Sequence, residues 1–528
     1  MNLVQSLFES AERHPDRAAL IGPENELSFA QLLGLTCGTS RQLQETGLSP
    51  GDRVLLLEPV TPGFYVRLLA CFHAGLEVMI LDPSADSQFL NQCMELTNPV
   101  AFIGSGRAHL LRLKLSSLRR VRLRFHTSGF VPFSRRIQEE PVAAFSPVAR
   151  QANDGALITF TSGSTGVPKA AVRSHAFLLA QHKALARSLD HADAQVDLVT
   201  LPVFTLANLA SGMTSVLADT DLRYPARADS LALSKQCRVH SVGRCAASPA
   251  FFQTMLEDGL LPEFQSIYTG GAPVFPRLLD ALCAASSEMR VIAVYGSTEA
   301  EPIAHQDWRL VSEFDRKKMA AGGGLLAGRP VDEISLRIIR DQSGELIPEV
   351  DEVALEAMTL EADAVGEVIV AGEHVLKGYL NGEGDAENKI HCGGEVWHRT
   401  GDAACLDAEG RLWLQGRCSA AVRGNHGERL YPLGPECLAM EYLTIDRCAL
   451  VESDGEPCLV VQAERGEIDH EELLKALAEF GVGRIMVVPE IPVDKRHNAK
   501  IDYPRLRQLL IDSSQGCPNS HFSSSASE

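Results

Sequence analysis

Residues 156–175 read ALITFTSGSTGVPKAAVRSH: a hydrophobic run, then a loop of Gly, Ser and Thr, then a predicted helix start at Ser174. Small residues let backbone N–H groups approach an anion closely, and the hydroxyls add further donors. Pro168 stiffens the loop and Lys169 adds a compact positive charge. The pattern therefore predicts either a phosphate-binding loop or a plain polar turn between a strand and a helix.

The spacing differs from the GxxxxGK[ST] loop of kinases and GTPases, because Gly163 and Gly166 lie close together and Lys169 follows a Val-Pro pair. The string TSGSTGVPK instead resembles the signature of the adenylate-forming superfamily, which includes acyl-CoA synthetases, luciferases and peptide-synthetase adenylation domains. The resemblance implies that this loop binds the phosphates of ATP, that Lys169 is catalytic and that Thr165 also serves a metal ion. The implied ATP-binding residues of the loop are Thr161, Ser162, Gly163, Ser164, Thr165 and Gly166.

Length and composition limit the classes of protein. The chain has 528 residues, 45% of them hydrophobic and 22% charged, with a formal net charge of -19. This length suits a large body with a smaller second domain, and the acidity disfavours a nucleic-acid binder. The 13 cysteines contain no CxxC pair or zinc spacing, so we expect reduced thiols and a cytoplasmic protein. Apolar runs such as residues 54–57 and 68–72 are too short to span a bilayer.

The organisation of the chain predicts a layered α/β fold. Strand and helix patterns alternate up to about residue 324, which indicates much parallel sheet. Residues 334–413 contain short alternating runs, which predict an antiparallel β unit, and a small α+β unit follows. With the resemblance, the prediction is an N-terminal AMP-binding domain (1–416) with a β subdomain, a mobile C-terminal lid (417–512) and a disordered tail (513–528).

Other superfamily motifs follow in order. YTGGAPV (268–274) resembles the glycine turn that lines the adenine and acyl pocket, and VYGSTEAEP (294–302) resembles the YGxTE motif. By this resemblance Tyr295 stacks on adenine, Thr298 contacts phosphate and Glu299 holds Mg²⁺, a role that suits a carboxylate. The other residues implied to contact the nucleotide here are Gly270, Gly271, Ala272 and Gly296, and those of a tentative acyl pocket are Phe204 and Gly271.

Two more motifs lie near the C-terminus. HRTGDAACLDAEGRLWLQGR contains a TGD signature, whose resemblance implies that Asp402 accepts hydrogen bonds from the ribose and that Arg417 contacts ribose or phosphate. IPVDKRHNAKID contains the lysine that the superfamily brings to the carboxylate and α-phosphate. Lys500 fits this catalytic role best, and Lys495 is the alternative. The alternative interpretations are that Asp402 only forms a turn and that these lysines are surface charges.

Features outside these motifs favour one branch of the superfamily. The segment LPVFTLANLASG lacks a histidine that often follows the aromatic residue in acyl-CoA synthetases. Ser419 stands where those enzymes carry an acidic residue or lysine. The motif that ends at the candidate lysine, Lys500, reads RHNAK. These features are similar to the olefin-biosynthesis β-lactone synthetases, often labelled fatty acid–CoA ligases. The resemblance implies ATP, Mg²⁺, a long-chain fatty or 3-hydroxy fatty acid, and possible partner enzymes of lipid biosynthesis. The departures disfavour CoA without excluding it.

Three features stay open. Glu301 and His305 follow the Mg²⁺ motif, and either is a candidate base for a β-hydroxyl, although a role in positioning the motif is the simpler interpretation. Residues 107–136 carry no acid. We favour a solvated basic face on an amphipathic helix and an edge strand, with a membrane surface or an acidic partner as alternatives.

The main hypothesis is an ATP-dependent acid ligase that forms an acyl-AMP and then a β-lactone. The first alternative is a thioester-forming ligase that uses CoA or an acyl-carrier protein. A second alternative, from another class, is a binding protein that keeps the fold without catalysis.

Overall fold

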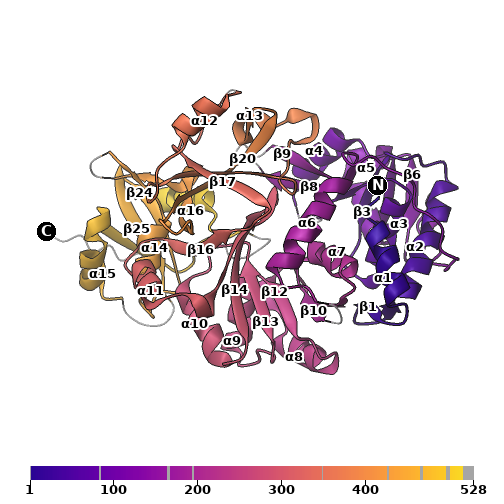
Figure 1. The fold of residues 1–528 in the computed structure, drawn as a ribbon, viewed down its shortest axis with the longest axis horizontal. Helices are drawn as coiled ribbons and strands as arrows, with labels where there is room; N and C mark the ends of the chain where they lie inside the picture. Colours follow the sequence, from indigo (N-terminus) through magenta and orange to yellow (C-terminus); the bar gives the residue numbers. More distant parts are fainter. Residues whose placement is uncertain are drawn as a thin grey trace.

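The computed structural model describes residues 2–82, 85–162, 167–192, 195–347, 349–424, 427–463, 468–494 and 500–514. The chain forms a mixed α/β fold in which the N-terminal part, the middle of the chain and the C-terminal part follow one another along the long axis (Figure 1). This arrangement confirms the predicted fold class.

The N-terminal part contains a seven-stranded sheet that is parallel except for one edge strand. Its order is β7 (Arg135–Arg136), β6 (Leu123–His126), β5 (Ala101–Gly104), β3 (Arg53–Leu57), β4 (Glu77–Ile80), β8 (Gly155–Ser162) and β9 (Pro168–Ser174). Helices are α1 (Gln5–Arg13), α2 (Phe29–Gln44), α3 (Pro62–His73), α4 (Ser87–Thr97), η1 (Ala108–Leu113), α5 (Ser116–Arg120) and α6 (His175–Ser188). Parallel strands of this kind are buried on both faces.

Strand β3 shows how the sequence specifies that burial. Val54 and Leu56 pack in the cluster that contains α2 and α3, whereas Leu55 and Leu57 pack in the cluster that contains α4 and α5. The run of apolar residues therefore fills two layers because successive side chains point to opposite faces. At the start of α2, Ser28 forms a capping box with Gln31.

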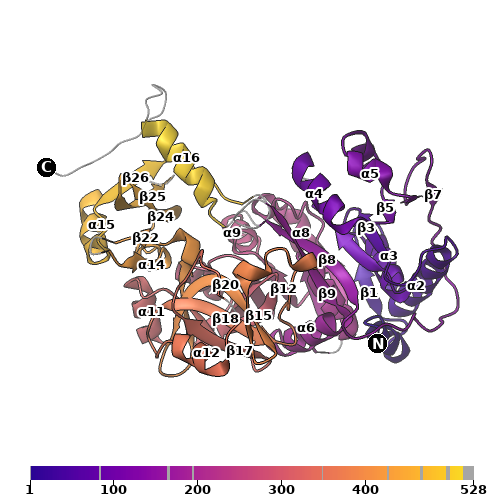
Figure 2. The same ribbon diagram turned by 90° about the horizontal axis from the view of Figure 1, so that it is seen from above.

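The second sheet has 14 strands and occupies the middle of the molecule (Figure 2). Its order is β17 (Ile334–Ile339), β18 (Gly366–Gly372), β20 (Glu395–Leu406), β21 (Leu412–Arg417), β16 (Leu325–Pro330), β15 (Ala300–Asp307), β14 (Arg290–Ser297), β13 (Ser266–Gly270), β12 (Arg244–Ala247), β10 (Val196–Val199), β11 (Thr214–Leu217), β1 (Ala18–Ile21) and β2 (Glu26–Ser28), with β19 (Lys389–Cys392) beside β20. Its helices are α7 (Pro202–Ala210), η2 (Pro225–Arg227), α8 (Ser230–Val239), α9 (Pro249–Glu257), α10 (Pro276–Ala285), η3 (Trp308–Leu310), α11 (Glu313–Ala320), α12 (Glu352–Met358), η4 (Leu380–Gly382) and α13 (Asp385–Asn388).

The predicted antiparallel unit is present but is not a detached sheet. Strands β17, β18, β20 and β21 pair antiparallel, and β21 continues through β16 and β15 into the parallel strands. One sheet therefore carries both the parallel and the antiparallel motifs of the sequence.

The C-terminal part has its own strands and core. It contains η5 (Cys418–Ala420), β22 (Val422–Arg423), β23 (Arg429–Leu430), α14 (Leu433–Ala439), β24 (Arg447–Ser453), β25 (Glu456–Gln462), α15 (His470–Leu477), η6 (Ala478–Phe480), β26 (Arg484–Val488) and α16 (Tyr503–Ser514). The order β24-β25-β26 forms a separate three-stranded sheet. Helix α16 extends two residues past the predicted start of the tail, and residues 515–528 lie outside the described part of the chain.

The fold differs from the sequence prediction just after the phosphate loop. Pro168 and Lys169 lie in a strand, β9, which pairs antiparallel with β8, instead of in a loop that leads directly to a helix. Proline is tolerated there because it is the first residue of an edge strand and needs no ladder hydrogen bond. The predicted helix start is confirmed, since Ser174 accepts a hydrogen bond from the Phe177 N–H as the cap of α6.

Candidate active site

The YGSTE residues lie where β14 turns back into β15. Strand β14 ends at Ser297, and Thr298 and Glu299 form the turn. The neighbouring parallel strand β13 ends at Gly270, so the predicted glycine turn leaves the sheet at the same edge. Ligands of α/β sheets bind at the carboxyl ends of such strands.

Glycine is required at this edge for two reasons. A Cβ atom at Gly270 would lie 2.3 Å from the carbonyl oxygen of Val294, so no side chain fits between the strands. Gly271 has a φ of +81°, which favours glycine. Gly271 and Ala272 then form the bend that leads to α10.

Asp402 joins the YGSTE motif to the TGD motif. The Tyr295 hydroxyl donates to Asp402 Oδ2 at 2.8 Å, and Arg417 Nη1 donates to Asp402 Oδ1 at 2.9 Å. Asp402 and Arg417 are cross-strand partners on β20 and β21. The Arg417 side chain is 56% exposed, so this ion pair is screened by water and contributes little to stability.

Glu299 is buried at the turn and is held as a carboxylate. Burial alone would raise its pKa, but the electrostatic interaction with His398, the Tyr379 hydroxyl, which donates to Oε1 at 2.8 Å, and the positive charge of Lys389 together outweigh burial and lower the pKa. A buried carboxylate that stays ionised is a costly feature for a fold, and such groups are concentrated at functional sites.

Two ammonium groups lie near the Tyr379 ring. Lys169 Nζ is 5.6 Å from the ring centroid, and Lys389 Nζ is 5.3 Å from it. Both distances permit cation–π attraction. Gly384 makes room for Lys169, since a Cβ there would lie 2.6 Å from the lysine Cε. Lys169 and Glu299, predicted from separate motifs, therefore meet around one tyrosine.

Lys389 is an unusual buried amine beside Glu299. Its Nζ donates to the Leu376 carbonyl and to His398 Nδ1, the latter at 3.2 Å. Burial lowers the pKa of Lys389 to about 8 despite the attraction of Glu299. Burial, with the Lys389 charge, lowers the pKa of His398 to about 3, so this ring is neutral and the positive charge near Glu299 belongs to Lys389.

Residues 375–379 join the two sheets at the site. Val375 forms a bridge to Ala300 of β15, and Tyr379 forms a bridge to Ala171 of β9. Between them the Leu376 N–H donates to the Glu299 carbonyl at 2.7 Å. The segment therefore fixes the distance between the strand of Lys169 and the turn of Glu299.

Arg173 makes a second connection between the sheets. From β9 its Nη1 donates to Thr159 Oγ1 at 3.0 Å, and its Nη2 donates to the carbonyl of Thr298 at 2.8 Å. The guanidinium is buried and lies 5.8 Å from the Phe177 ring centroid. A rigid fork of donors can hold two partners at once in this way.

Some predicted residues are not described by the structure, and others lie in parts of the chain away from the YGSTE turn. Gly163, Ser164, Thr165 and Gly166 lie outside the described residues, as does the alternative lysine, Lys495. Lys500 is exposed and lies in the C-terminal part, where its N–H donates to Asp494 Oδ1 at 2.9 Å and its carbonyl accepts from the Asp494 N–H at 2.8 Å. Thr161 is half-buried opposite Lys169 in the β8–β9 hairpin, and the side chain of Ser162 is not described.

The two candidate bases are separated along β15. Glu301 is near the turn, because a Cβ on Gly296 would lie 3.1 Å from Glu301 Cγ. His305 pairs with Val294 further along the strand, and its electrostatic neighbours include Asp190 at the other end of the sheet. Of the two, Glu301 is the one that lies against the YGSTE motif.

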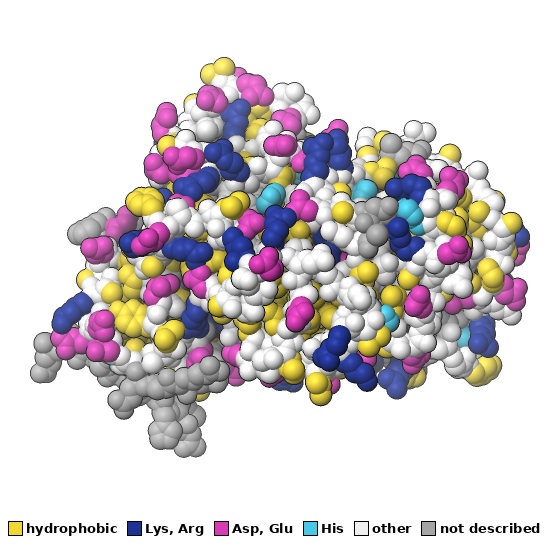
Figure 3. All heavy atoms as spheres, turned by 60° about the horizontal axis from the view of Figure 1, so that its bottom comes forward, with side chains coloured by type: hydrophobic (Ala, Val, Ile, Leu, Met, Phe, Trp, Pro, Cys, Tyr) yellow, Lys and Arg dark blue, Asp and Glu magenta, His cyan; other side chains and the backbone are white. Residues whose placement is uncertain are grey.

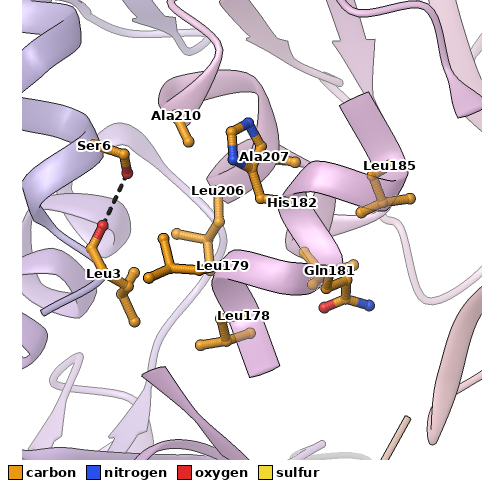
Figure 4. Close-up of a pocket in the computed structure, with 11 residues that line it drawn as sticks. Leu3, Ser6, Leu178, Leu179, Gln181, His182, Leu185, Leu206, Ala207 and Ala210 are labelled. Carbon is orange, nitrogen blue, oxygen red and sulfur yellow. Dashed lines mark hydrogen bonds between the residues drawn. The ribbon is translucent and has the colours of Figure 1, made fainter. Parts of the chain in front are cut away.

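Phe204 is buried in α7 beside a hollow between helices. It packs in a cluster with Leu185 and Ala207, and these two residues also line the hollow between α1, α6 and α7 (Figure 4). Leu178, Leu179 and Leu206 make most of the remaining wall apolar, and Gln181 and His182 add polar groups. The Gln181 amide also donates to the carbonyl of Glu301 at 3.3 Å, which connects this hollow to the start of β15.

Three further observations concern the surface, the helices and the remaining groups of the described residues. On the face drawn in Figure 3, acidic and basic side chains are interspersed. No helix in the described ranges is long and apolar enough to cross a membrane. The described residues contain no group of three or more His, Cys, Asp or Glu that could hold a metal, and the 12 cysteines among them are unpaired.

Sequence reasoning missed Arg173, Tyr379, Lys389 and His398. Tyr379 stands in the short string KGYLNGEG, where a tyrosine between glycines was a usable signal of a tight, specific position. Lys389 gave no signal, because nothing in ENKIHC distinguishes a buried lysine from a solvated one.

Comparisons with known proteins show the class of enzyme to which this site belongs. The AMP-binding enzyme family model matches residues 7–380. The olefin beta-lactone synthetase of Stenotrophomonas maltophilia is 31% identical over 96% of this chain and 97% of its own length. The chain therefore belongs to the AMP-binding enzyme family, and it is an AMP-forming acid ligase.

Solved structures share the fold. The amide bond synthetase McbA from Marinactinospora thermotolerans has a TM-score of 0.78 at 20% identity, covering 96% of this chain and 99% of that one. O-succinylbenzoate coenzyme A synthetase from Bacillus subtilis, solved with ATP and a magnesium ion, has a TM-score of 0.75 at 21% identity, covering 96% and 99%.

Proposed function

We propose that this enzyme activates a long-chain 3-hydroxy fatty acid with ATP and Mg²⁺ and then closes the acyl-AMP to a β-lactone. The observation that carries the proposal is the set of contacts made by residues 295–299. Tyr295 at one end of this segment binds Asp402, and Glu299 at the other end binds Tyr379, whose ring lies near Lys169. A binding site for a nucleotide and a site for its phosphates are thus joined in one segment. The 31% identity to the Stenotrophomonas synthetase supports the second step.

The nucleoside is held by the glycine turn and the TGD motif. Each oxygen of Asp402 keeps acceptor capacity beyond its bond to Tyr295 or Arg417, so the carboxylate is able to accept the ribose hydroxyls. The same bond fixes the Tyr295 ring for stacking on adenine, and the lack of side chains at Gly270 and Gly271 leaves the base room to approach.

Glu299 is suited to Mg²⁺. This cation takes one or two protein carboxylates and leaves its other positions to phosphates and water, so the ionised Glu299 is suited to hold it. Bound Mg²⁺ supplies positive charge that neutralises the phosphates. Tyr379 and Lys389 orient the carboxylate and keep it ionised. Thr165, which lies outside the described residues, is proposed as the second metal residue.

In the first step a carboxylate oxygen of the acid attacks the α-phosphorus, the bond from that phosphorus to the bridging oxygen breaks, and pyrophosphate leaves. Lys169 stabilises the phosphate charge from β9. Lys500 supplies a second cation at the carboxylate and α-phosphate when residues 417–512, the proposed mobile lid, close over residues 1–416.

In the second step the 3-hydroxyl oxygen attacks the acyl carbon, the carbon–oxygen bond to AMP breaks, and AMP leaves with the electron pair. The hydroxyl proton passes to Glu301, which lies against Gly296. Proximity within one molecule favours this attack, although four-membered ring strain offsets part of the gain.

The aliphatic tail extends past Phe204 between α6 and α7. The hollow in Figure 4 has a mostly apolar wall and shares Leu185 and Ala207 with the cluster that contains Phe204, but its accessible volume is about 30 Å³, so the helices must separate for a long chain to enter. If this is correct, Leu206→Trp should lower activity on long acids far more than on short ones.

The decisive experiment is ATP–pyrophosphate exchange with fatty and 3-hydroxy fatty acids, followed by mass spectrometry of products with and without CoA. Exchange and a β-lactone without CoA support the proposal, whereas strict dependence on CoA would establish the thioester alternative. Lys169→Ala, Lys500→Ala and Glu299→Gln should each lose exchange, and exposed Lys475→Ala should not. Unchanged exchange in the first three would show that the assigned site is wrong.

The two steps are separable. Glu301→Gln should keep pyrophosphate exchange and lose lactone formation, because it removes the base and leaves the adenylation residues in place. Equal loss of both activities would instead assign Glu301 to positioning the YGSTE turn.

A further inference from the structure

The segments that follow β5 and β6 form an exposed face at one end of the seven-stranded sheet. We call residues 107–114 and 127–136 the docking face. Four of its large apolar side chains lie mainly in solvent, with exposed fractions of 62% for Leu110, 79% for Leu113, 88% for Phe130 and 89% for Phe133. Single exposed apolar residues are common, but four on two adjacent segments mark a contact surface.

The two segments are attached to each other, so the apolar groups belong to one surface. Arg112 Nη1 donates to the carbonyl of Pro132 at 3.4 Å, and the Gly106 N–H donates to Ser128 Oγ at 3.3 Å. Val131 is buried between the two exposed phenylalanines in sequence and anchors the loop to the body. The phenylalanine side chains are therefore held outward from a fixed loop.

The charge of this face is opposite to that of the protein. The docking face contains five Lys and Arg and no Asp or Glu, in a chain of net charge -19. Arg107, Lys114, Arg135 and Arg136 are exposed beside the apolar groups. A basic, apolar surface on an acidic protein is complementary to an anionic partner.

The topology places this face on the active-site side of the sheet. Strands β3, β4, β5, β6 and β8 are all parallel, so their carboxyl ends share one edge. The docking face follows β5 and β6 at that edge, and β8 ends there at Ser162, where the phosphate loop begins. Four strand spacings separate β6 from β8, which is roughly 19 Å.

We propose that the docking face binds an anionic lipid surface. Phe130 and Phe133 enter the boundary between headgroups and acyl chains, and the basic side chains around them pair with lipid phosphates. A bilayer accepts projecting apolar groups of any shape, whereas an acidic protein would need pockets that match these four side chains, so the exposure favours lipid. Bound in this way, the edge of the sheet that carries the active site faces the membrane.

Vesicle sedimentation with the full chain tests this proposal independently of the reaction. The wild type should bind vesicles that contain roughly 30% phosphatidylglycerol and not neutral phosphatidylcholine vesicles, and added salt should weaken binding. The double variant Phe130→Ser/Phe133→Ser should reduce vesicle binding at least about tenfold. The separate double variant Arg135→Glu/Arg136→Glu should reduce vesicle binding more than the phenylalanine variant does. Both variants lose binding because stable anchoring needs the apolar and the basic groups together. Leu443→Ser, which removes a side chain that is 78% exposed in the C-terminal part, is the matched control and should bind as wild type.

Pyrophosphate exchange in detergent-free buffer with a short, soluble acid should stay unchanged in the docking-face variants, which shows that they are folded. Wild type that does not bind anionic vesicles, or a phenylalanine double variant that binds equally well, would overturn the proposal. Saturable binding to poly-glutamate without vesicle binding would also overturn it and would indicate an acidic protein partner.

Discussion

The hydroxyl of Tyr379 donates a 2.8 Å hydrogen bond to Glu299, while the ammonium groups of Lys169 and Lys389 lie 5.6 Å and 5.3 Å from the centroid of the same tyrosine ring. One side chain thus links the proposed metal carboxylate to the proposed phosphate lysine. Because Tyr379 is held by its bridge to Ala171, it positions the other three groups without being one of the predicted motif residues.

Tyr379→Phe should weaken the binding of Mg²⁺ without unfolding the protein. The ring and its contacts to the lysines remain, but Glu299 loses its hydrogen-bond donor, and loss of such a supporting group typically costs 10–100-fold in metal affinity or activity. Pyrophosphate exchange measured against Mg²⁺ concentration should show a higher half-saturating concentration. Tyr224→Phe, on the exposed surface, is the control; a purely structural role for Tyr379 would lower thermal stability and leave the Mg²⁺ curve in place.

Arg173→Lys should raise the KM for ATP about tenfold, a loss on the order of 1.4 kcal/mol. One ammonium group cannot hold Thr159 and the carbonyl of Thr298 in the geometry of the guanidinium fork. Steady-state exchange kinetics measure this effect. Arg187→Lys changes an exposed arginine paired with Glu333 and should leave KM alone, so an equal change in both variants would rule out a specific role for Arg173.

Asp341→Asn should loosen the C-terminal part. Asp341 is buried and accepts from Tyr431 at 2.8 Å and pairs with Arg429 at 2.5 Å; burial opposes ionisation, but the Ser343 N–H and these partners lower its pKa. Losing the charge should cost about 1–3 kcal/mol. Faster trypsin cleavage near residues 417–430 is the expected result.

The matched control for this experiment is Asp454→Asn, which breaks the exposed pair with Arg484 and should change little. Identical cleavage rates in wild type and Asp341→Asn would mean that other contacts hold the C-terminal part in place. The bond from Arg277 to the carbonyl of Ile445, at 2.9 Å, would then be the next to remove.

Glu436→Gln should remove a pH dependence of stability. Burial raises the pKa of Glu436 from 4.5 to about 7, so between these values the unfolded carboxyl loses its proton while the folded one keeps it. The contribution of Glu436 to the free energy of unfolding is fully present below pH 4.5 and is lost as pH rises through about 7, a change on the order of 3 kcal/mol.

Urea unfolding at pH 5 and pH 7.5 measures this difference. Glutamine keeps acceptors for the Leu450 N–H and the Tyr503 hydroxyl, so the variant should be folded and should lose less stability than wild type on going to pH 7.5. The exposed Glu361→Gln variant should follow wild type. A wild type whose stability does not decline over this range would contradict the raised pKa.

The sequence by itself determined the fold class, the order of the motifs and the family. TSGSTGVPK and YGSTE are local strings whose turns and glycines depend on nearby residues, so their positions at strand ends could be predicted before any contact was known, whereas TGD lies within β20. Cross-strand pairing of Asp402 with Arg417 follows from the same local pattern, because one hairpin carries both.

Only the tertiary structure decided which residues surround those motifs. Arg173, Tyr379 and Lys389 act across two sheets, and their burial depends on segment 375–379, which joins strands distant in sequence. The basic residues 107–136 are an example of the same limit. The sequence shows their positive charge directly. The outward placement of Phe130 and Phe133, in contrast, depends on how the segments that follow β5 and β6 pack together. Charge is a property of each residue, whereas exposure is set by packing.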